Sequence, residues 1–252
     1  MTEPADFYTG LVADLYSPLR SFTADPARYA SFIASSGEPA LELGCGDGDP
    51  LLDLRALGLD VDGVDSSADM LDRLRASAAA RGLSATVYQQ RIEDLDLPRR
   101  YRSIFLAGAT FNLLATDEVA LRALRAIHAH LTDDGTALVP LFVPAPTSAD
   151  QLGEFRSVVT DDATIRVGVI DEDWDAATRT RRTLLRYERE TAAGVELVDR
   201  VWLLHWHRPA GFRALAREAG LAVLAVTEDD GAPVGDDAHE FTFRLGRDLS
   251  GH

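Results

Sequence analysis

The stretch 40–52 reads Ala-Leu-Glu-Leu-Gly-Cys-Gly-Asp-Gly-Asp-Pro-Leu-Leu, and it decides the fold. A short apolar run ends in glycines at alternate positions, Gly44, Gly46 and Gly48, and a second apolar run follows Pro50. Alternate glycines permit positive φ angles, and proline is tolerated in the first turn of a helix. The stretch therefore predicts a strand, a tight turn and a helix. A ligand can lie against the bare main chain of such a turn, beside the free N–H groups of the helix.

The charges around this turn disfavour a pyrophosphate ligand. A dinucleotide-binding turn requires glycine at the sixth position, which counted from Gly44 is Asp49. Glu42 and Asp47 add two further acids, and negative charge at this place repels phosphate. A cationic or zwitterionic ligand is favoured, so a dinucleotide enzyme ranks last among the alternatives. A plain glycine turn in an α/β protein remains a second interpretation of the stretch.

A second motif follows at the end of the next predicted strand, 60–65. Asp65 ends this strand, and an acid at the carboxyl end of the strand beside the glycine turn is placed to accept hydrogen bonds from both hydroxyls of a ribose. Ser66 or Ser67 is expected to cap the following helix, with Met70 one turn inside it. Two plainer interpretations stay open: Asp65 as a surface turn acid and Met70 as a core residue.

The pattern Glu42-x-Gly44-x-Gly46-x-Gly48, followed by Asp65, resembles the class I S-adenosylmethionine-dependent methyltransferases that act on small molecules. The resemblance implies an α/β fold: a Rossmann-like, seven-stranded mixed sheet whose last strand is antiparallel, with helices on both faces and an N-terminal helical lid. It implies S-adenosylmethionine as cofactor. Its expected contacts in this part of the chain are Glu42 at the amino-acid end, Gly44, Cys45, Gly46, Gly48, Asp65 at the ribose, Ser66, and Met70 beside the adenine.

Length and composition predict one domain. The chain has 252 residues and no linker divides it. Within a single class I methyltransferase domain over 1–252, the expected parts are a helical lid, a cofactor-binding core, an insertion over the acceptor pocket, and strands with a helix that complete the sheet. Their expected bounds are 1–36, 37–143, 144–180 and 181–252 in that order. A short helix is expected at 150–155, a strand at 164–170 and an antiparallel pair at 180–192 and 195–206.

The charge and the residue composition narrow the classes of partner, chemistry and location that are expected. The formal net charge is −16, with 41 acids against 25 bases, which disfavours nucleic acid as a partner. The chain has no lysine, so lysine Schiff-base chemistry is excluded. One cysteine, no basic apolar leader and no long apolar run favour a cytoplasmic protein without a membrane partner. The oligomeric state, monomer or homodimer, is left open.

The chain departs from the family pattern where the adenine is expected. The third strand, 85–89, continues into Gln90-Arg91-Ile92-Glu93. The resemblance implies an acid at the position of Arg91 for the adenine amine, and then an apolar residue, here Ile92, whose backbone N–H meets the ring. Arginine accepts no hydrogen bond. Glu93 or a backbone carbonyl is therefore expected to accept from the amine, or Arg91 stacks on the ring.

The fourth predicted strand, 101–107, is apolar enough to be buried on both faces, and the loop after it should open beside the reacting sulfonium. The motif that marks amide or nucleobase methylation, Asp- or Asn-Pro-Pro-Tyr, is absent. The resemblance implies that Leu106 and Phe111 are cofactor contacts, with Phe111 sheltering the cofactor. Asn112 is expected to orient an acceptor, unless it only caps a helix or supports a turn.

Candidate catalytic groups lie at the two ends of the chain. The resemblance implies that Tyr8 and Tyr16 of the predicted lid lie near the transferred methyl group, although aromatic side chains on an amphipathic helix can equally be core residues. His205 and His207 share one face of a strand, and a neutral imidazole can take a proton from a hydroxyl or ammonium acceptor. The alternative places both on the exposed side of an edge strand. No metal is expected, because no cysteine or histidine lies at zinc spacing from His128 and His130.

The predicted function is transfer of a methyl group from S-adenosylmethionine to an O, N or C atom of a small-molecule acceptor by in-line displacement. The carbon is already activated by the sulfonium, so the protein mainly aligns the acceptor and excludes water. A base is needed only for a protonated acceptor. Two alternatives stay open: an enzyme that uses the cofactor in another reaction, such as cyclisation of its aminobutyrate arm, and a binding module without turnover.

Overall fold

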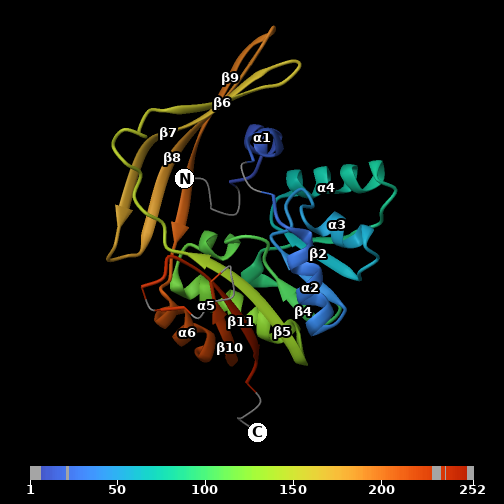
Figure 1. The fold of residues 1–252 in the computed structure, drawn as a ribbon. Helices are drawn as coiled ribbons and strands as arrows, with labels where there is room; N and C mark the ends of the chain where they lie inside the picture. The colour runs from blue at the N-terminus through green and yellow to red at the C-terminus, as the bar shows by residue number, and fades with distance from the viewer. Residues whose placement is uncertain (1–6, 21–22, 229–233, 236, 249–252) are drawn as a thin grey trace.

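The computed structural model describes residues 7–20, 23–228, 234–235 and 237–248. A seven-stranded sheet forms the centre of the fold, in the order β10-β11-β5-β4-β1-β2-β3 (Figure 1). Its strands are β1 (Ala40–Leu43), β2 (Val61–Asp65), β3 (Thr86–Gln89), β4 (Tyr101–Phe105), β5 (Leu131–Phe142), β10 (Leu221–Thr227) and β11 (Glu240–Arg247).

The direction of the strands agrees with the predicted mixed sheet. β1 lies between β2 and β4 and is parallel to both, and every residue of β1 is buried. β11 is antiparallel to its two neighbours, β5 and β10. Apart from Glu42, β1 is apolar, which agrees with this placement, because a parallel strand in the middle of a sheet is buried on both faces. The predicted fold class, with its last strand antiparallel, is confirmed.

Helices cover both faces of this sheet, and each group packs on its own apolar core. On one face lie α2 (Pro26–Ser36), α3 (Leu51–Ala56) and α4 (Ala68–Ala80), whose buried side chains form one cluster with β1 and β2. On the other face lie α5 (Asp117–His130) and α6 (Pro209–Glu218). Two short 3-10 helices, η2 (Ile92–Asp94) and η3 (Thr110–Leu113), follow β3 and β4 and stand at the carboxyl edge of the sheet.

A second sheet stands apart from the first and was not predicted. It holds β6 (Phe155–Val159), β7 (Thr164–Asp175), β8 (Thr180–Thr191) and β9 (Gly194–His205), all antiparallel (Figure 1). The assignment of the strands within 181–206 to the main sheet is wrong, and so is the short helix at 150–155. The charged residues that punctuate β8 and β9 leave them mostly half-buried or exposed, so they do not suit the interior of a parallel sheet.

Helix α1 (Leu11–Leu19) lies between the second sheet and α4 (Figure 1). Leu15 and Leu19 pack against Ile165 of β7. Asp14 pairs with Arg73 of α4, and Arg189 of β8 lies 3.4 Å from the same carboxylate. Of the two helices predicted for the lid, only α1 takes this position, whereas α2 packs on the main sheet. Residues 1–6 and 21–22 of the predicted lid lie outside the described residues.

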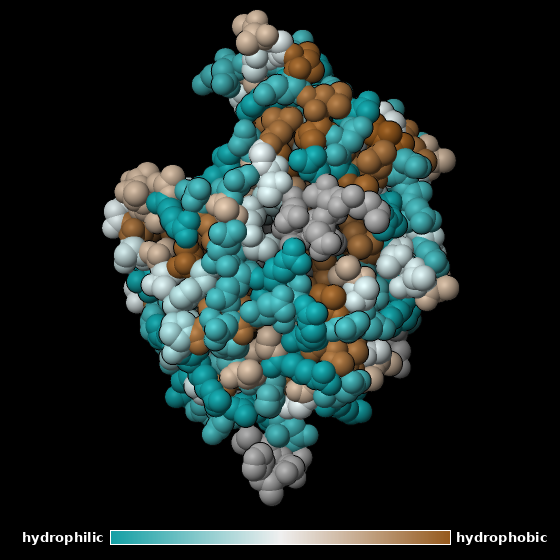
Figure 2. Space-filling view, turned by 180° about the vertical axis from the view of Figure 1, so that it is seen from behind, coloured by the Kyte–Doolittle hydropathy of each residue, from teal (hydrophilic) through white to brown (hydrophobic). Residues whose placement is uncertain are grey.

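The surface is unevenly apolar. Figure 2 shows brown, apolar residues gathered at the level of the second sheet, whereas teal, hydrophilic residues dominate the surface below it. Exposed apolar side chains of the second sheet include Val159, Val195 and Leu197. Among the helices that the structure describes, none has both the length and the apolar character needed to cross a membrane.

Candidate functional site

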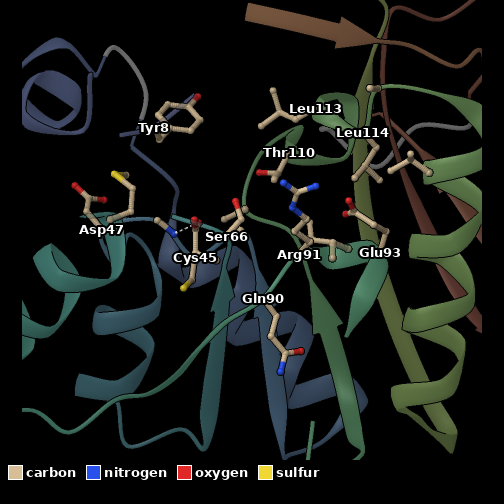
Figure 3. Close-up of a pocket in the computed structure, with 18 of the residues that line it drawn as sticks. Tyr8, Cys45, Asp47, Ser66, Gln90, Arg91, Glu93, Thr110, Leu113 and Leu114 are labelled. Carbon is tan, nitrogen blue, oxygen red and sulfur yellow. Dashed lines mark hydrogen bonds between the residues drawn. The ribbon is translucent and has the colours of Figure 1, made fainter. Parts of the chain in front are cut away.

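A cavity of about 370 Å³ opens at the carboxyl ends of β1, β2 and β4, beneath α1. In Figure 3, Tyr8 faces it from one side and Thr110, Leu113 and Leu114 from another, with Ser66 and Arg91 between them. Many of the predicted site residues line this one cavity. They are Tyr8, Tyr16, Gly44, Cys45, Gly46, Asp65, Ser66, Met70, Arg91, Ile92 and Glu93.

Asp65 holds the glycine turn against the end of β2. Its Oδ2 accepts a hydrogen bond of 2.9 Å from the amide of Gly46, and its Oδ1 accepts one of 2.8 Å from the amide of Ser67. Ser67 in turn caps α4 by accepting from the amide of Met70. Each carboxylate oxygen can accept a further hydrogen bond, so Asp65 can still bind a ligand that enters the cavity.

Gly44 is required by the wall that closes over it. Its φ is +74°, and a Cβ added here would lie 2.6 Å from Cγ2 of Thr110 in η3. A β-branched side chain cannot give way by that amount without moving the backbone that carries it. The missing side chain therefore lets η3, which carries Thr110 and Leu113, approach the turn and form one wall of the cavity.

Glu42 is a buried carboxylate without a counter-charge of its own. It is fully buried at the end of β1, and neither of its carboxylate oxygens has a hydrogen-bond partner within the described part of the chain. Burial raises the pKa of Glu42 well above its usual value, and the nearby charges of Asp49, Asp65 and Asp47 raise it further. A buried polar group without a partner is unusual in a folded protein, and it commonly marks a place where a ligand binds.

Helix α1 is held on the glycine turn by its last residues. Arg20 lies 2.8 Å from Asp49 and 3.5 Å from Asp47, and the hydroxyl of Ser17 donates a hydrogen bond of 2.6 Å to Asp47. These contacts hold α1 at the mouth of the cavity. Arg20 is thus the cation that the acids of the turn share, and it belongs to the lid.

Two tyrosines form the roof of the cavity. The rings of Tyr8 and Tyr16 meet edge to face with centroids 5.4 Å apart. The backbone carbonyl of Tyr8 accepts a hydrogen bond of 2.5 Å from the hydroxyl of Ser67, which fixes the segment before α1. Burial raises the pKa of both phenols, so both stay protonated and can donate a hydrogen bond into the cavity.

The segment after β3 supplies the opposite wall. Arg91, Ile92 and Glu93 line the cavity where η2 begins. Gln90 also lines it, but in Figure 3 its side chain points away from the other labelled residues, and its amide bonds to the backbone of Asp96. The segment therefore offers a carboxylate, a guanidinium and backbone groups to a ligand.

Residues 40–135, which include the glycine turn, Asp65 and η3, match the family model of a methyltransferase domain. The chain therefore contains a methyltransferase domain. This match confirms the family that the glycine turn and Asp65 predict. Comparison with curated protein sequences gave no match.

Solved structures with the same fold extend this likeness to nearly the whole chain. The CcbJ methyltransferase from Streptomyces caelestis is 24% identical over 98% of both chains, with a TM-score of 0.76. A sugar N-methyltransferase from a Streptoalloteichus species is 21% identical over 95% of this chain and 94% of its own, with a TM-score of 0.73. An amino pentose methyltransferase from Micromonospora echinaspora, solved with S-adenosylmethionine bound, is 20% identical over 95% and 98%, with a TM-score of 0.68.

Several residues predicted for the site lie beside the cavity or in the core, outside its lining. Glu42 lies beneath the glycine turn, and Gly48 packs against Leu52 and Leu74. Leu106 and Phe111 are fully buried, and the ring of Phe111 packs edge to face on Phe212, with centroids 5.2 Å apart. Phe111 therefore faces the core.

Asn112 also faces inward. Its amide nitrogen donates to the carbonyls of Phe142 (2.8 Å) and His205 (3.3 Å), and its oxygen accepts from the amide of Phe142. These bonds join η3 to β5 and β9. The side chain is thus committed to the backbone, and it is not among the residues that line the cavity.

His205 and His207 come together with each other but not with the cavity. Both are buried, so the alternative of an exposed strand face is wrong. Their rings are 4.7 Å apart, and Asp117 and Arg179 lie against them. Burial lowers the pKa of His207 to about 3, and it also lowers the pKa of His205. The donor atoms of Asp117, His205 and His207 lie within 4.8 Å of one another, a spacing that can hold a metal ion.

The lining also contains residues that the sequence analysis did not assign to the site. The start of α5 and the residues before it form the far wall, because η3 turns the chain back over the cavity. The residues missed are Asp47, Asp49, Gln90, Ala107, Thr110, Leu113, Leu114, Ala115, Val119 and Arg122. For two of these residues the sequence holds a signal: Val119 and Arg122 are three residues apart and therefore lie on one face of the predicted helix.

Proposed function

We propose that this chain transfers a methyl group from S-adenosylmethionine to an amine of a small, sugar-like acceptor. The observation that carries the proposal is the cavity at the carboxyl edge of the sheet, where a glycine turn, a strand-end acid and a two-tyrosine roof enclose one space. Ligands of open α/β sheets bind at this edge. The methyltransferase domain match supports the reaction class.

The donor is proposed to lie along the glycine turn. Asp65 accepts hydrogen bonds from the ribose, and Met70 and Ile92 contact the adenine, with Glu93 accepting from its amine. The amino-acid end lies toward Glu42 and Asp49, which favour its ammonium group and the sulfonium. Cys45, Gly46 and Ser66 contribute the remaining contacts from the lining, while Arg91 stacks on the ring or pairs elsewhere.

The acceptor is proposed to enter beneath α1, covered by the second sheet and the segment before it. Aromatic faces and carboxylates both attract a cationic amine, and Tyr8, Tyr16 and Asp47 supply them at this side. Two of the solved structures with this fold are described as a sugar N-methyltransferase and an amino pentose methyltransferase, which supports the amine class. Alignment of the amine nitrogen with the methyl carbon and exclusion of water supply most of the rate.

The acceptor amine must lose a proton before or after transfer. The carboxylates at the cavity are the nearest groups that can take it, with Asp47 on the acceptor side. His205 and His207 remain a second proposal for this role, and they would need a proton path through η3. Replacement of each group in turn, with the pH dependence of the transfer rate as readout, separates the two.

Calorimetry and product analysis test the proposal. Titration with S-adenosylmethionine and with S-adenosylhomocysteine should give one binding event each, and a panel of amino sugars should give products heavier by one methyl group. Formation of methylthioadenosine with no methylated acceptor would favour the cyclisation alternative. Binding without turnover of any acceptor would favour the binding module, and absence of heat with both ligands would remove the donor from the site.

A further inference from the structure

A cluster of potential metal ligands lies outside the cavity, where three elements meet. Asp117 begins α5, His205 ends β9, and His207 follows two residues later, just before α6. Oδ1 of Asp117 is 3.4 Å from Nε2 of His205 and 3.6 Å from Nδ1 of His207. One carboxylate oxygen thus faces both imidazoles.

These separations are close to those of a tetrahedral zinc site. Zinc binds imidazole nitrogen and carboxylate oxygen at about 2.0 to 2.2 Å, which places neighbouring ligand atoms about 3.3 Å apart. The two oxygen-to-nitrogen distances exceed that edge only slightly, and all three donor atoms lie within 4.8 Å of one another, so an adjustment of the side chains can enclose an ion. Imidazole with carboxylate is a ligand set that suits zinc.

The three side chains of this cluster combine two rigid, buried imidazoles with one partly exposed carboxylate. The side chains of His205 and His207 are 3% and 1% exposed, so their positions are fixed by packing, and the side chain of Asp117 is 50% exposed. An ion here would have protein ligands on its inner side and access to water on its outer side.

Arg179 is the competitor for this site. Its Nη1 lies 3.3 Å from Nδ1 of His207, and its Nη2 donates to the other oxygen of Asp117 at 2.5 Å. The guanidinium therefore covers the lone pair that a metal would need. Arg179 stands in the turn between β7 and β8 with a φ of +57°, and its side chain is 31% exposed, so it can withdraw into solvent.

We propose that Asp117, His205 and His207 bind one Zn²⁺ ion when Arg179 withdraws from His207. The ion would join the start of α5 to the end of the second sheet. Leu114 and Ala115, which line the cavity, directly precede this part of α5. The ion would therefore brace the cavity wall without touching the transferred group. The site does not depend on the proposed donor or acceptor, but an ion held by both imidazoles would exclude His205 and His207 as the group that takes the proton of the acceptor.

The test is a titration of the chelator-stripped full chain with Zn²⁺ against a chromophoric competitor. We expect one ion per chain. His207→Gln and His205→Gln should each weaken binding by at least roughly tenfold, because each removes a ligand. Arg179→Gln should tighten it by a similar factor, because the competing cation is gone. His239→Gln is the matched control, since His239 is exposed and outside the cluster, and it should bind like the unmodified chain.

The outcomes separate the zinc site from an arginine network. Thermal melting of each metal-free variant checks that it folds, and X-ray absorption of the loaded chain should show only nitrogen and oxygen ligands, with two imidazoles. Binding that survives in both histidine variants would overturn the proposal. So would binding that occurs only in Arg179→Gln, because Arg179 would then be the permanent occupant, and so would absence of binding in every form.

Discussion

The two ends of β1 and β2 are both acidic, yet they are built in opposite ways. At the amino end, Asp60 lies 2.6 Å from Arg99, and Asp62 accepts a hydrogen bond of 2.9 Å from the buried hydroxyl of Tyr101. The hydrogen bond from Arg99 lowers the pKa of Asp60. Each acid at this end has a partner from the loop before β4 or from β4 itself.

At the carboxyl end the acids outnumber their partners. Glu42 has no cation and no side-chain partner among the residues described, and Arg20 is shared by Asp47 and Asp49. Unsatisfied buried charge costs stability, so it persists where a function requires it. The difference teaches that the pairing of the acids, rather than their presence, distinguishes the edge proposed to bind the ligand from the opposite edge.

The largest expected effect comes from a methyl group at Gly44. Gly44→Ala adds strain at a positive φ, about 1 to 2 kcal/mol, and a clash with Thr110 that costs about 1 to 3 kcal/mol more. Gly58→Ala at the amino end of β2 is the control, since Gly58 has a φ of +84° but nothing within 4 Å of an added Cβ. Urea unfolding of both variants gives the two costs, and equal losses would show that Thr110 moves freely.

The next largest effect is a difference in ligand affinity between variants at the carboxyl end and at the amino end of β2. Asp65→Ala should weaken the affinity for S-adenosylhomocysteine by about 1 to 3 kcal/mol, because the ribose and the amide of Gly46 both lose a charged acceptor. Asp62→Ala should leave this affinity unchanged and instead lower stability by about 1 to 3 kcal/mol, because the hydroxyl of Tyr101 is left buried and unpaired. Calorimetry and thermal melting measure the pair. Affinity losses of the same size in both variants would contradict the comparison.

The smallest effect concerns Glu42 and depends on pH. The raised pKa of Glu42 in the folded chain means that its stability contribution is present below its ordinary pKa and is lost as pH rises toward the folded value. Glu42→Gln avoids this loss. Without ligand, the variant should melt about 2 to 4 °C above the unmodified chain near pH 8, with little difference near pH 5.

Glu118→Gln, which changes an exposed acid of α5, should show no such gap at either pH. A variant Glu42→Gln that melts lower than the unmodified chain near pH 8 would mean that the carboxylate is stabilised as the anion, and the carboxyl end would then resemble the amino end.

Most of the main sheet could be predicted, because local rules decide it. Alternate glycines after β1, an acid at the end of β2 and apolar runs in β4 and β5 each specify one turn or one buried strand. The second sheet could not be assigned in the same way. Its strands β8 and β9 are visible as an antiparallel pair, and β7 pairs with β8 across the short turn 176–179, but nothing local says whether these hairpins join the main sheet or form a sheet of their own.

The cavity lining was predicted where it is formed by the sequence motifs at the ends of β1 and β2, as at Gly46 and Asp65. It was missed where a loop folds back, as at Thr110 and Leu113, because the path of η3 depends on the bonds of Asn112 to β5 and β9. The partner of the two histidines was missed for the same reason. Asp117 is far from them in sequence, and no spacing rule connects a helix start to the end of a distant strand.

The position of α1 has a consequence for redesign of the acceptor range. Leu19, the last residue of α1, contacts the second sheet, and Arg20, directly after the helix, contacts the glycine turn, so one short segment touches both. If the second sheet covers the acceptor as proposed, residue changes in β7 or β8 that admit a bulkier acceptor are expected to shift α1 and so weaken the ion pair between Arg20 and Asp49. Variants selected for new acceptors should therefore also be measured for their affinity for S-adenosylmethionine, because a change in acceptor range is expected to change the affinity for the donor as well.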